Sequence, residues 1–261
     1  MLGRLKTVLK GYSMVSLPAF DDAPTLSRGR NIQAGYQRGW GLQFGDLVGQ
    51  LHQDPLYRAA LKVSAGRTVV SEANRMNIYL ALRFGMDDLA PGHIVEFGTY
   101  RGGNALFMAH ICKELHPDMK IYAFDTYEGM PETDAERDAH RAGDFEDAGY
   151  EEILRLIEKQ QLDNLVLVKG LFEDTAPDAL KEIGPVRLNH IDCDIYSAVK
   201  YSYDVSIPNM VDGGYWVFDD ALYSSCIGAM EAVEELVVQR DGRSAEQVFP
   251  HLVYRNLDPS V

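Results

Sequence analysis

The sequence predicts an α/β protein with a doubly wound, mostly parallel sheet, and two observations carry this prediction. After Gly92, short apolar runs typical of buried strands alternate with segments of helical spacing. Strands separated by helices require crossover connections, which are right-handed in nearly all parallel sheets and place helices on both faces. Three glycines, Gly98, Gly102 and Gly103, follow the first apolar run, as expected where a strand turns sharply into a helix beside a ligand.

Five strands and five helices are expected to alternate along this part of the chain, and two extended runs in the tail have no helix between them. Such a tail predicts an antiparallel pair at one edge of the sheet. The expected strands are His93–Phe97, Lys120–Phe124, Leu165–Val168, Val186–Ile191 and Tyr215–Phe218, the helices are Asn104–Leu115, Tyr150–Gln161, Pro177–Ile183, Ser197–Met210 and Ile227–Gln239, and the tail runs are Gln247–Phe249 and His251–Arg255.

Residues 1–72 are expected to form an N-terminal arm and lid segment, and residues 73–261 the main domain, within one structural unit overall. Residues 1–30 fit either a loosely ordered leader or an arm that packs on another subunit. The glycine- and aromatic-rich stretch that follows, which includes Trp40 and Phe44, fits either a lid over the substrate or a structural cap over the core.

Two helices are predicted ahead of the sheet. Apolar residues recur at helical spacing in Pro55–Ser64 and again in Val70–Phe84, with Gly85 near the end of the second segment. The second helix is expected to pack on the sheet just before the glycine turn.

The composition of the chain indicates which kinds of partner it can bind. The chain has 261 residues, enough for one α/β domain with additions, and its formal net charge is -14, from 39 acids against 25 bases. Nucleic-acid binding relies on clustered lysine and arginine, so this balance argues against a nucleic-acid partner and favours a small or neutral substrate.

Cysteine usage indicates a reducing compartment. Cys112, Cys193 and Cys226 are widely spaced and odd in number, a pattern that suggests neither a disulfide framework nor a zinc site. The N-terminus lacks the apolar core of a signal peptide, and no stretch approaches the roughly 18 apolar residues of a membrane span. We expect a cytoplasmic protein without a membrane partner.

Acidic residues stand at the ends of several predicted strands. In a doubly wound sheet, ligands bind outside the carboxyl ends of the strands. Asp125 follows the second strand, about where such folds place the acid that accepts the ribose hydroxyls. Its alternatives are a solvated loop acid or a helix cap. The turn after the first strand has the spacing E-x-G-x-x-x-G-G and therefore lacks the G-x-G-x-x-G of a dinucleotide site.

The sharpest pattern is a set of acids after the fourth and fifth strands. Asp192 follows the fourth strand, and Asp219 and Asp220 follow the fifth, so one strand-helix-strand unit separates them. Three carboxylates brought together would repel one another unless a cation binds, and Mg²⁺ prefers such oxygen ligands. The alternative is that Asp220 caps the next helix and Asp194 is solvated, with no metal.

Other candidate residues have a structural interpretation. His190 lies inside the fourth strand and is expected to be a hydrogen-bonded core histidine rather than a base. Phe172, after the third strand, fits either a cover for a flat ring or plain core. Ser224 and Ser225 have no paired base at a useful spacing, so a hydrolase triad is not supported.

Five sequence blocks together resemble a known family. In order, IVEFGTYRGGNA, AFDTYEGMP, VKGLFEDT, HIDCDIYSAVK and GGYWVFDD are similar to the motifs of the macrocin-type (TylF) O-methyltransferases, class I S-adenosylmethionine enzymes that act on deoxysugars of natural products. The resemblance covers about residues 73–236. One departure is Cys193, where better-known members have glycine between the two acids, and it bears on substrate identity.

The resemblance implies a Rossmann-like class I methyltransferase sheet, with S-adenosylmethionine across the first strand ends. Glu96 and the glycine turn would hold the methionine half, Asp125 the ribose, and Thr126 with Phe172 the adenine side. Family members bind Mg²⁺ through acids that match Asp192, Asp219 and Asp220. The implied cofactor-binding residues are Glu96, Gly98, Tyr100, Gly102, Asn104, Asp125, Thr126, Gly170, Phe172 and Asp192.

The predicted activity is therefore methylation of a hydroxyl on a sugar, polyol or glycosylated natural product, dependent on S-adenosylmethionine and a hard divalent cation. Asp192 is the candidate for both metal ligand and catalytic base, with Asp194 second. A homo-oligomer, dimer or higher, is expected. Two alternatives stay open: an NAD-dependent oxidoreductase or epimerase on the same type of sheet, and a non-catalytic methyltransferase-like assembly protein.

Overall fold

The computed structural model describes residues 26–27, 30–31 and 47–257 of the chain. The chain divides into two compact units, Met1–Pro55 and Leu56–Val261, and each is described by itself. In the first unit, β1 (Leu26–Ser27) pairs antiparallel with β2 (Arg30–Asn31), and α4 (Leu47–Gln53) follows. The predicted lid around Trp40 and Phe44, and most of the leader, lie outside the described residues. The predicted boundary at residue 72 stays a prediction.

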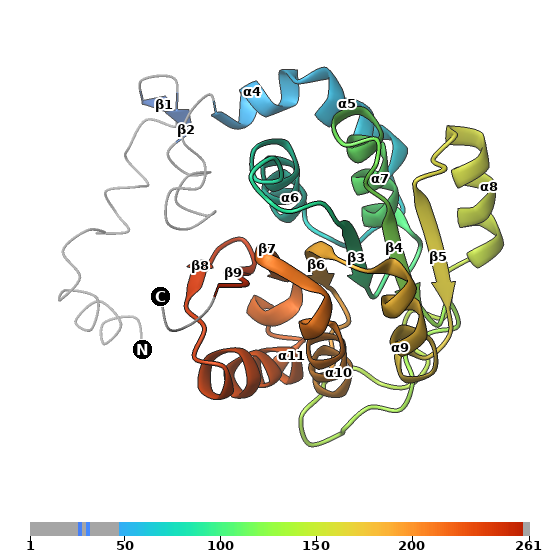
Figure 1. Ribbon diagram of the computed structural model, residues 1–261, viewed down its shortest axis with the longest axis vertical. Helices are drawn as coiled ribbons and strands as arrows, with labels where there is room; N and C mark the ends of the chain where they lie inside the picture. Colours follow the sequence, from blue (N-terminus) through green and yellow to red (C-terminus); the bar gives the residue numbers. More distant parts are fainter. Residues whose placement is uncertain (1–25, 28–29, 32–46, 258–261) are drawn as a thin grey trace. The chain divides into compact units, whose positions relative to one another are not determined.

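The second unit contains a seven-stranded sheet in the order β5-β4-β3-β6-β7-β9-β8 (Figure 1). The first five strands in this order run parallel, and β9 and β8 complete one edge in antiparallel pairing. The prediction of a doubly wound, mostly parallel sheet with an antiparallel C-terminal edge is confirmed. The strands are β3 (His93–Phe97), β4 (Ile121–Asp125), β5 (Leu165–Lys169), β6 (Val186–Ile191), β7 (Met210–Phe218), β8 (Ala245–Gln247) and β9 (Leu252–Arg255).

The helices of this unit follow the predicted order. Helices α9, α10 and α11 lie on one side of the sheet in Figure 1, and α6 on the other. The helices are α5 (Pro55–Val63), α6 (Glu72–Phe84), α7 (Gly103–Leu115), α8 (Tyr150–Gln160), α9 (Phe172–Ile183), α10 (Tyr196–Ser206), α11 (Ile227–Ala232) and the wider-wound η4 (Val233–Arg240), with short 3₁₀ turns η2 (Ile207–Asn209) and η3 (Asp220–Leu222). Among the described residues, none of these helices combines the length and apolarity that a bilayer crossing requires.

One predicted strand and one predicted helix are shorter than the observed elements, because both begin earlier in the structure. Strand β7 begins at Met210 rather than Tyr215, and the predicted helix Ser197–Met210 ends earlier, as α10 at Ser206. Helix α9 begins at Phe172 rather than Pro177. Acidic side chains in its first turn complement the helix dipole, and these favour a start before the proline.

Alternation along β3 and β6 decides which side chains meet. Val95 and Phe97 of β3 join the core beneath α9, α10 and η4, together with Ile191 of β6. Successive side chains of a strand point to opposite faces. Glu96 and His190, which are paired in register on neighbouring strands, therefore share the opposite face.

The turn that follows β3 requires glycine at position 98. Gly98 has φ of 87°, in the left-handed region that side chains rarely adopt. A Cβ atom there would overlap the backbone carbonyl oxygen of Asp192, which follows the neighbouring strand β6. Gly98 thus allows the backbones of the two strand ends to pass close to one another.

We predict that Gly98→Ala lowers the free energy of unfolding far more than Gly143→Ala. Gly143 has a similar φ of 89°, but a Cβ atom at this position would have none of the described atoms within 4 Å, so it is a matched control for backbone strain alone. The control substitution is expected to cost about 1–2 kcal/mol, and steric overlap adds about 1–3 kcal/mol at Gly98. Urea unfolding of both variants measures the difference, and equal losses would contradict the close approach.

Candidate active site

A pocket of about 860 Å³, part of it open to solvent, lies at the carboxyl ends of the central strands. This is the edge at which a doubly wound sheet binds its ligands. Its walls come from the turns after β3, β4 and β6, the start of α9 and the segment between β4 and α8. The lining residues are Val69, Gly98, Thr99, Tyr100, Asp125, Thr126, Gly129, Met130, Pro131, Phe145, Leu171, Phe172, Glu173, Asp192, Cys193, Asp194, Ile195, Ser197 and Ala198.

Asp125 organises the turn after β3. Its Oδ2 accepts hydrogen bonds from the backbone N–H groups of Thr99 (2.7 Å) and Tyr100 (2.8 Å), and its Oδ1 accepts one from that of Tyr127 (2.6 Å). The alternative of a solvated loop acid is wrong, because this carboxylate ties two strand-end turns together while it lines the pocket. These bonds hold Tyr100, which has φ of 51°, in its left-handed conformation.

The predicted cofactor residues divide into two groups. Gly98, Tyr100, Asp125, Thr126, Phe172 and Asp192 line the pocket. Phe172 also packs edge-on against Phe97, with ring centroids 5.1 Å apart, so it serves the core and the pocket at once. The residues of the second group are absent from the pocket wall, and their binding roles stay predictions: Glu96, Gly102, Asn104 and Gly170.

Glu96 is fully buried and contacts two side chains on its own face of the sheet. Its Oε1 accepts a hydrogen bond from Nδ2 of Asn104 at 2.8 Å and lies 3.2 Å from Nδ1 of His190. Its Oε2 has no hydrogen-bond partner within the part of the chain that the structure describes. The acid that the sequence suggests as an anchor for the cofactor is therefore an ion-pair partner of a buried histidine.

His190 links Glu96 to the acids after β7. Its other nitrogen, Nε2, lies 3.4 Å from Oδ1 of Asp219. Burial alone would lower the pKa of His190, but the hydrogen bonds to Asp219 and Glu96 outweigh it and raise the pKa to about 9. The protonated ring donates to both carboxylates. The prediction of a hydrogen-bonded core histidine is confirmed.

Two further side chains bind Asp219, and sequence reasoning missed both. Asn74 of α6 donates from Nδ2 to Oδ1 of Asp219 at 2.8 Å, and Nδ1 of His251 lies 3.2 Å from the same oxygen. Burial opposes ionisation of Asp219, but the hydrogen bonds from His190 and His251 prevail and lower its pKa. No sequence spacing relates Asn74 and His251 to Asp219, because Asn74 lies near the start of the second unit and His251 near its end.

Asp219 also meets the two other predicted metal ligands. One carboxylate oxygen each of Asp192, Asp219 and Asp220 lies within 4.8 Å of the others. Burial, followed by the charges of neighbouring acids, raises the pKa of Asp192 and Asp220 well above the usual range. Such a set is unfavourable when ionised alone and suits a hard divalent cation with oxygen ligands, so the donor set fits Mg²⁺.

The alternative arrangement of these acids is not observed. Asp220 does not cap α11, whose N-cap residue is Cys226; the Oδ2 of Asp220 instead accepts a hydrogen bond from the backbone N–H of Asp194 at 2.9 Å. Asp194 is half-buried rather than solvated, and its side chain contacts Cys226 and His140. Asp194 therefore lines the pocket but lies outside the Asp192–Asp219–Asp220 set.

The fold and the pocket define a Rossmann-like α/β protein with the strand order and edge pairing of class I methyltransferases. Among solved structures, the chain is similar to the O-methyltransferase NovP (TM-score 0.60, 23% identity, covering 81% of this chain and 95% of that one) and to the calicheamicin methyltransferase CalS11 (TM-score 0.58, 19% identity, covering 88% and 98%). Both likenesses support the fold.

The chain belongs to the macrocin-O-methyltransferase (TylF) family, whose profile matches residues 59–241. It is 26% identical over 178 residues to the 8-demethyl-8-(2,3-dimethoxy-alpha-L-rhamnosyl)-tetracenomycin-C 4'-O-methyltransferase of Streptomyces olivaceus, covering 64% of this chain and 67% of that one. It is also 26% identical over 201 residues to the demethyldecarbamoylnovobiocin O-methyltransferase of Streptomyces niveus, covering 70% and 75%. The predicted resemblance is confirmed. The family match favours an O-methyltransferase over the two alternatives, an oxidoreductase and a non-catalytic protein.

We predict that Glu96→Gln shifts the pH dependence of stability. A histidine whose pKa is raised on folding contributes stability that is fully present below about pH 6.5 and is lost as the pH rises through about 9. Glutamine keeps the acceptor for Asn104 but removes the charge beside His190, so the folded-state pKa of His190 should fall, the loss should be complete at a lower pH, and the cost should be on the order of 1 kcal/mol near pH 8. Urea unfolding across this pH range measures it; an unchanged profile would contradict the ion pair.

We predict that Asp220→Asn stabilises the metal-free protein near neutral pH. An acid whose pKa is raised on folding destabilises the fold increasingly as the pH rises above its unfolded value, 3.8. Asparagine keeps an acceptor for the N–H of Asp194 and removes the charge. A gain of about 1 kcal/mol corresponds to roughly 2–4 °C in Tm. Thermal unfolding in chelator is the measurement, and the gain should vanish near pH 4; a lower Tm at neutral pH would contradict it.

Proposed function

We propose that this chain transfers a methyl group from S-adenosylmethionine to a hydroxyl of a sugar or glycosylated natural product, with a hard divalent cation, Mg²⁺ by preference, at Asp192, Asp219 and Asp220. The observation that carries the proposal is the meeting of these three carboxylates beside a pocket that Gly98, Asp125 and Asp192 line. Membership of an O-methyltransferase family supports the reaction type.

The methyl donor would occupy the part of the pocket between β3 and β4. In this proposal the backbone at Gly98 and Tyr100 faces the methionine half, Asp125 the ribose, and Thr126 with Phe172 the adenine. All five line the pocket. Glu96, Gly102, Asn104 and Gly170 would act from behind the pocket wall by holding the turns in place, since none of them lines it.

The chain's own residues would position the acceptor and take its proton. Transfer of a methyl group from a sulfonium is a displacement in which orientation of the attacking oxygen does most of the work. A hard cation, when bound, orients a coordinated hydroxyl and lowers its pKa. Asp192 is the candidate base because it lies in the acid set and also lines the pocket, within reach of an acceptor bound there. Asp194 is the second candidate.

Other features support a sugar-bearing acceptor. The name of one curated relative includes a rhamnosyl group, and another is a mycinamicin III 3''-O-methyltransferase of Micromonospora griseorubida, 25% identical over 185 residues. The net charge of -14 disfavours anionic acceptors. We also expect a homo-oligomer that acts in the cytoplasm.

We predict that Asp192→Asn lowers kcat by about 10²–10⁴ while S-adenosylmethionine still binds. The substitution removes the charge and the base but keeps the shape of the side chain. Transfer of labelled methyl from S-adenosylmethionine to a panel of glycosides, read by mass spectrometry, gives the turnover, and calorimetric titration gives donor binding. Asp178→Asn is the control, because Asp178 is an exposed acid on α9 outside the pocket.

Metal removal provides the second arm of this experiment. Chelator should abolish turnover by the wild-type enzyme, and added Mg²⁺ should restore it. Full turnover in chelator would overturn the metal proposal alone. Failure of the wild-type protein to bind S-adenosylmethionine would overturn the proposed reaction.

A further inference from the structure

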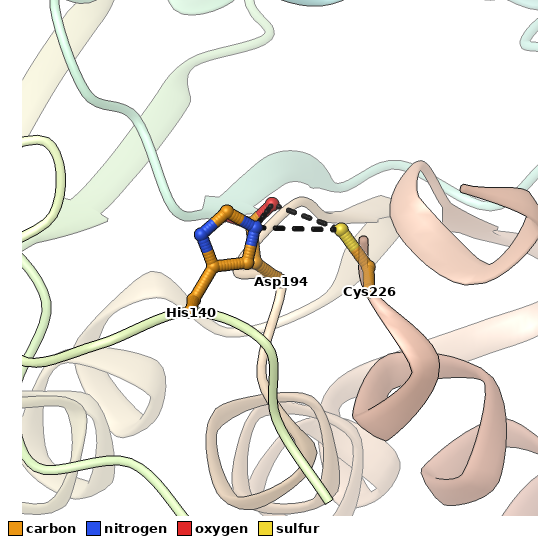
Figure 2. Close-up of side chains that lie close together, drawn as sticks. All are labelled: His140, Asp194 and Cys226. Carbon is orange, nitrogen blue, oxygen red and sulfur yellow. Dashed lines mark hydrogen bonds and ion pairs between the residues drawn. The ribbon is translucent and has the colours of Figure 1, made fainter. Parts of the chain in front are cut away.

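A second cluster of metal-ligating side chains stands beside the pocket, and the proposed methyl transfer does not use it. Three elements contribute: His140 comes from the segment between β4 and α8, Asp194 follows β6, and Cys226 immediately precedes α11 (Figure 2). Figure 2 shows Nε2 of His140, Oδ1 of Asp194 and Sγ of Cys226 converging on one point. These atoms share no residue with the Asp192–Asp219–Asp220 set.

The distances between the three donor atoms are those of a tetrahedral site. Sγ of Cys226 lies 3.3 Å from Oδ1 of Asp194 and 3.8 Å from Nε2 of His140, and Nε2 lies 3.7 Å from Oδ1. A zinc ion with ordinary Zn–S, Zn–N and Zn–O bonds at tetrahedral angles separates such donors by roughly 3.4–3.6 Å. Shifts of a few tenths of an ångström would therefore complete the arrangement.

The surroundings orient two of the three donors for this purpose. Nδ1 of His140 lies 3.1 Å from Oδ2 of Asp144, which leaves Nε2 free to face the cluster. A carboxylate on the far nitrogen is the usual support of a metal-bound histidine. The backbone N–H of Asp194 donates to Oδ2 of Asp220 at 2.9 Å, which holds the backbone that carries the Asp194 side chain. Cys226 is buried, 3% exposed, so its sulfur is shielded from solvent.

We propose that His140, Asp194 and Cys226 bind a zinc-type divalent cation, with the fourth coordination position left to water. A mixed sulfur, nitrogen and oxygen donor set selects a borderline-soft metal over Mg²⁺, which prefers oxygen alone. The Cys226 thiol now donates a hydrogen bond to Asp194, so binding replaces that S–H by a metal–thiolate bond and releases one proton to solvent.

The ion would fasten one wall of the pocket. The segment between β4 and α8 supplies Gly129, Met130, Pro131 and Phe145 to the pocket lining. Its middle is already held by Asp138, whose Oδ1 accepts the backbone N–H of Tyr196 at 2.9 Å. A metal at His140 would join the same segment to the turns before α10 and α11.

Cobalt substitution tests the site directly on the full-length protein, independently of methyl transfer. Co²⁺ bound to a thiolate gives a sulfur-to-metal charge-transfer band in the near ultraviolet, which a site of carboxylates alone does not give. Titration of the metal-free wild-type protein with Co²⁺, in the presence of excess Mg²⁺, is expected to produce this band with a stoichiometry of one. Added Zn²⁺ should abolish it by displacement.

Four variants test whether the charge-transfer band comes from the cluster of His140, Asp194 and Cys226. Cys226→Ala should lose it and His140→Gln should weaken Co²⁺ binding at least tenfold, whereas Cys112→Ala and His110→Gln, matched substitutions on α7 outside the cluster, should keep it. Circular dichroism checks that each variant folds. The proposal is overturned if the wild-type protein gives no charge-transfer band, which would mean that the three side chains only bond one another, or if the band survives in Cys226→Ala.

Discussion

The arrangement of the site depends on one constraint, the cost of holding several carboxylates together at the edge of a sheet. Asp192, Asp219 and Asp220 lie within a few ångströms of one another in largely buried surroundings. The protein offsets part of that cost with His190, whose protonated ring lies between Glu96 and Asp219. Asp219 is thus kept ionised, whereas its neighbours have raised pKa values. A cation is the natural completion of such a set.

The structure adds most to the interpretation of Glu96. An acid inside an apolar strand next to a glycine turn suggests a ligand anchor. Strand alternation turns its side chain to the face that it shares with His190, and neighbouring parallel strands in register bring the two together, while its cofactor role stays a prediction. The turn itself is held by Asp125, from the next strand along. The two acids therefore have different tasks: Asp125 shapes the pocket wall, and Glu96 fixes the charge of the histidine behind it.

Much of the fold and part of the site could be predicted because they follow the order of the chain. Alternating apolar runs and helical segments specify the parallel sheet, and the rule that ligands bind at the carboxyl ends of strands selects Asp125, Asp192 and Asp219. Contacts that depend on side-chain direction or on distant segments leave no such pattern. His251 reaches Asp219 from the tail, and Cys226 meets His140 across 86 residues. Cysteine spacing suggests no metal, because these ligands come from three separate turns.

The two clusters of metal-ligating side chains beside the pocket offer contrasting ligand atoms, which bears on how the proposed sites would bind two different metal ions. Three carboxylates supply the oxygen ligands that suit a hard ion, and in the proposed reaction such an ion would lower the pKa of a coordinated hydroxyl. With the proposed zinc-type ion bound, His140, Asp194 and Cys226 would join the β4–α8 segment to the turns before α10 and α11. Because thiolate and imidazole discriminate against Mg²⁺, each set can select its own ion although the residues Asp192 and Asp194 are separated by only one position. Cys193 stands at that intervening position and is itself buried, so the departure from glycine lies between the two donor sets.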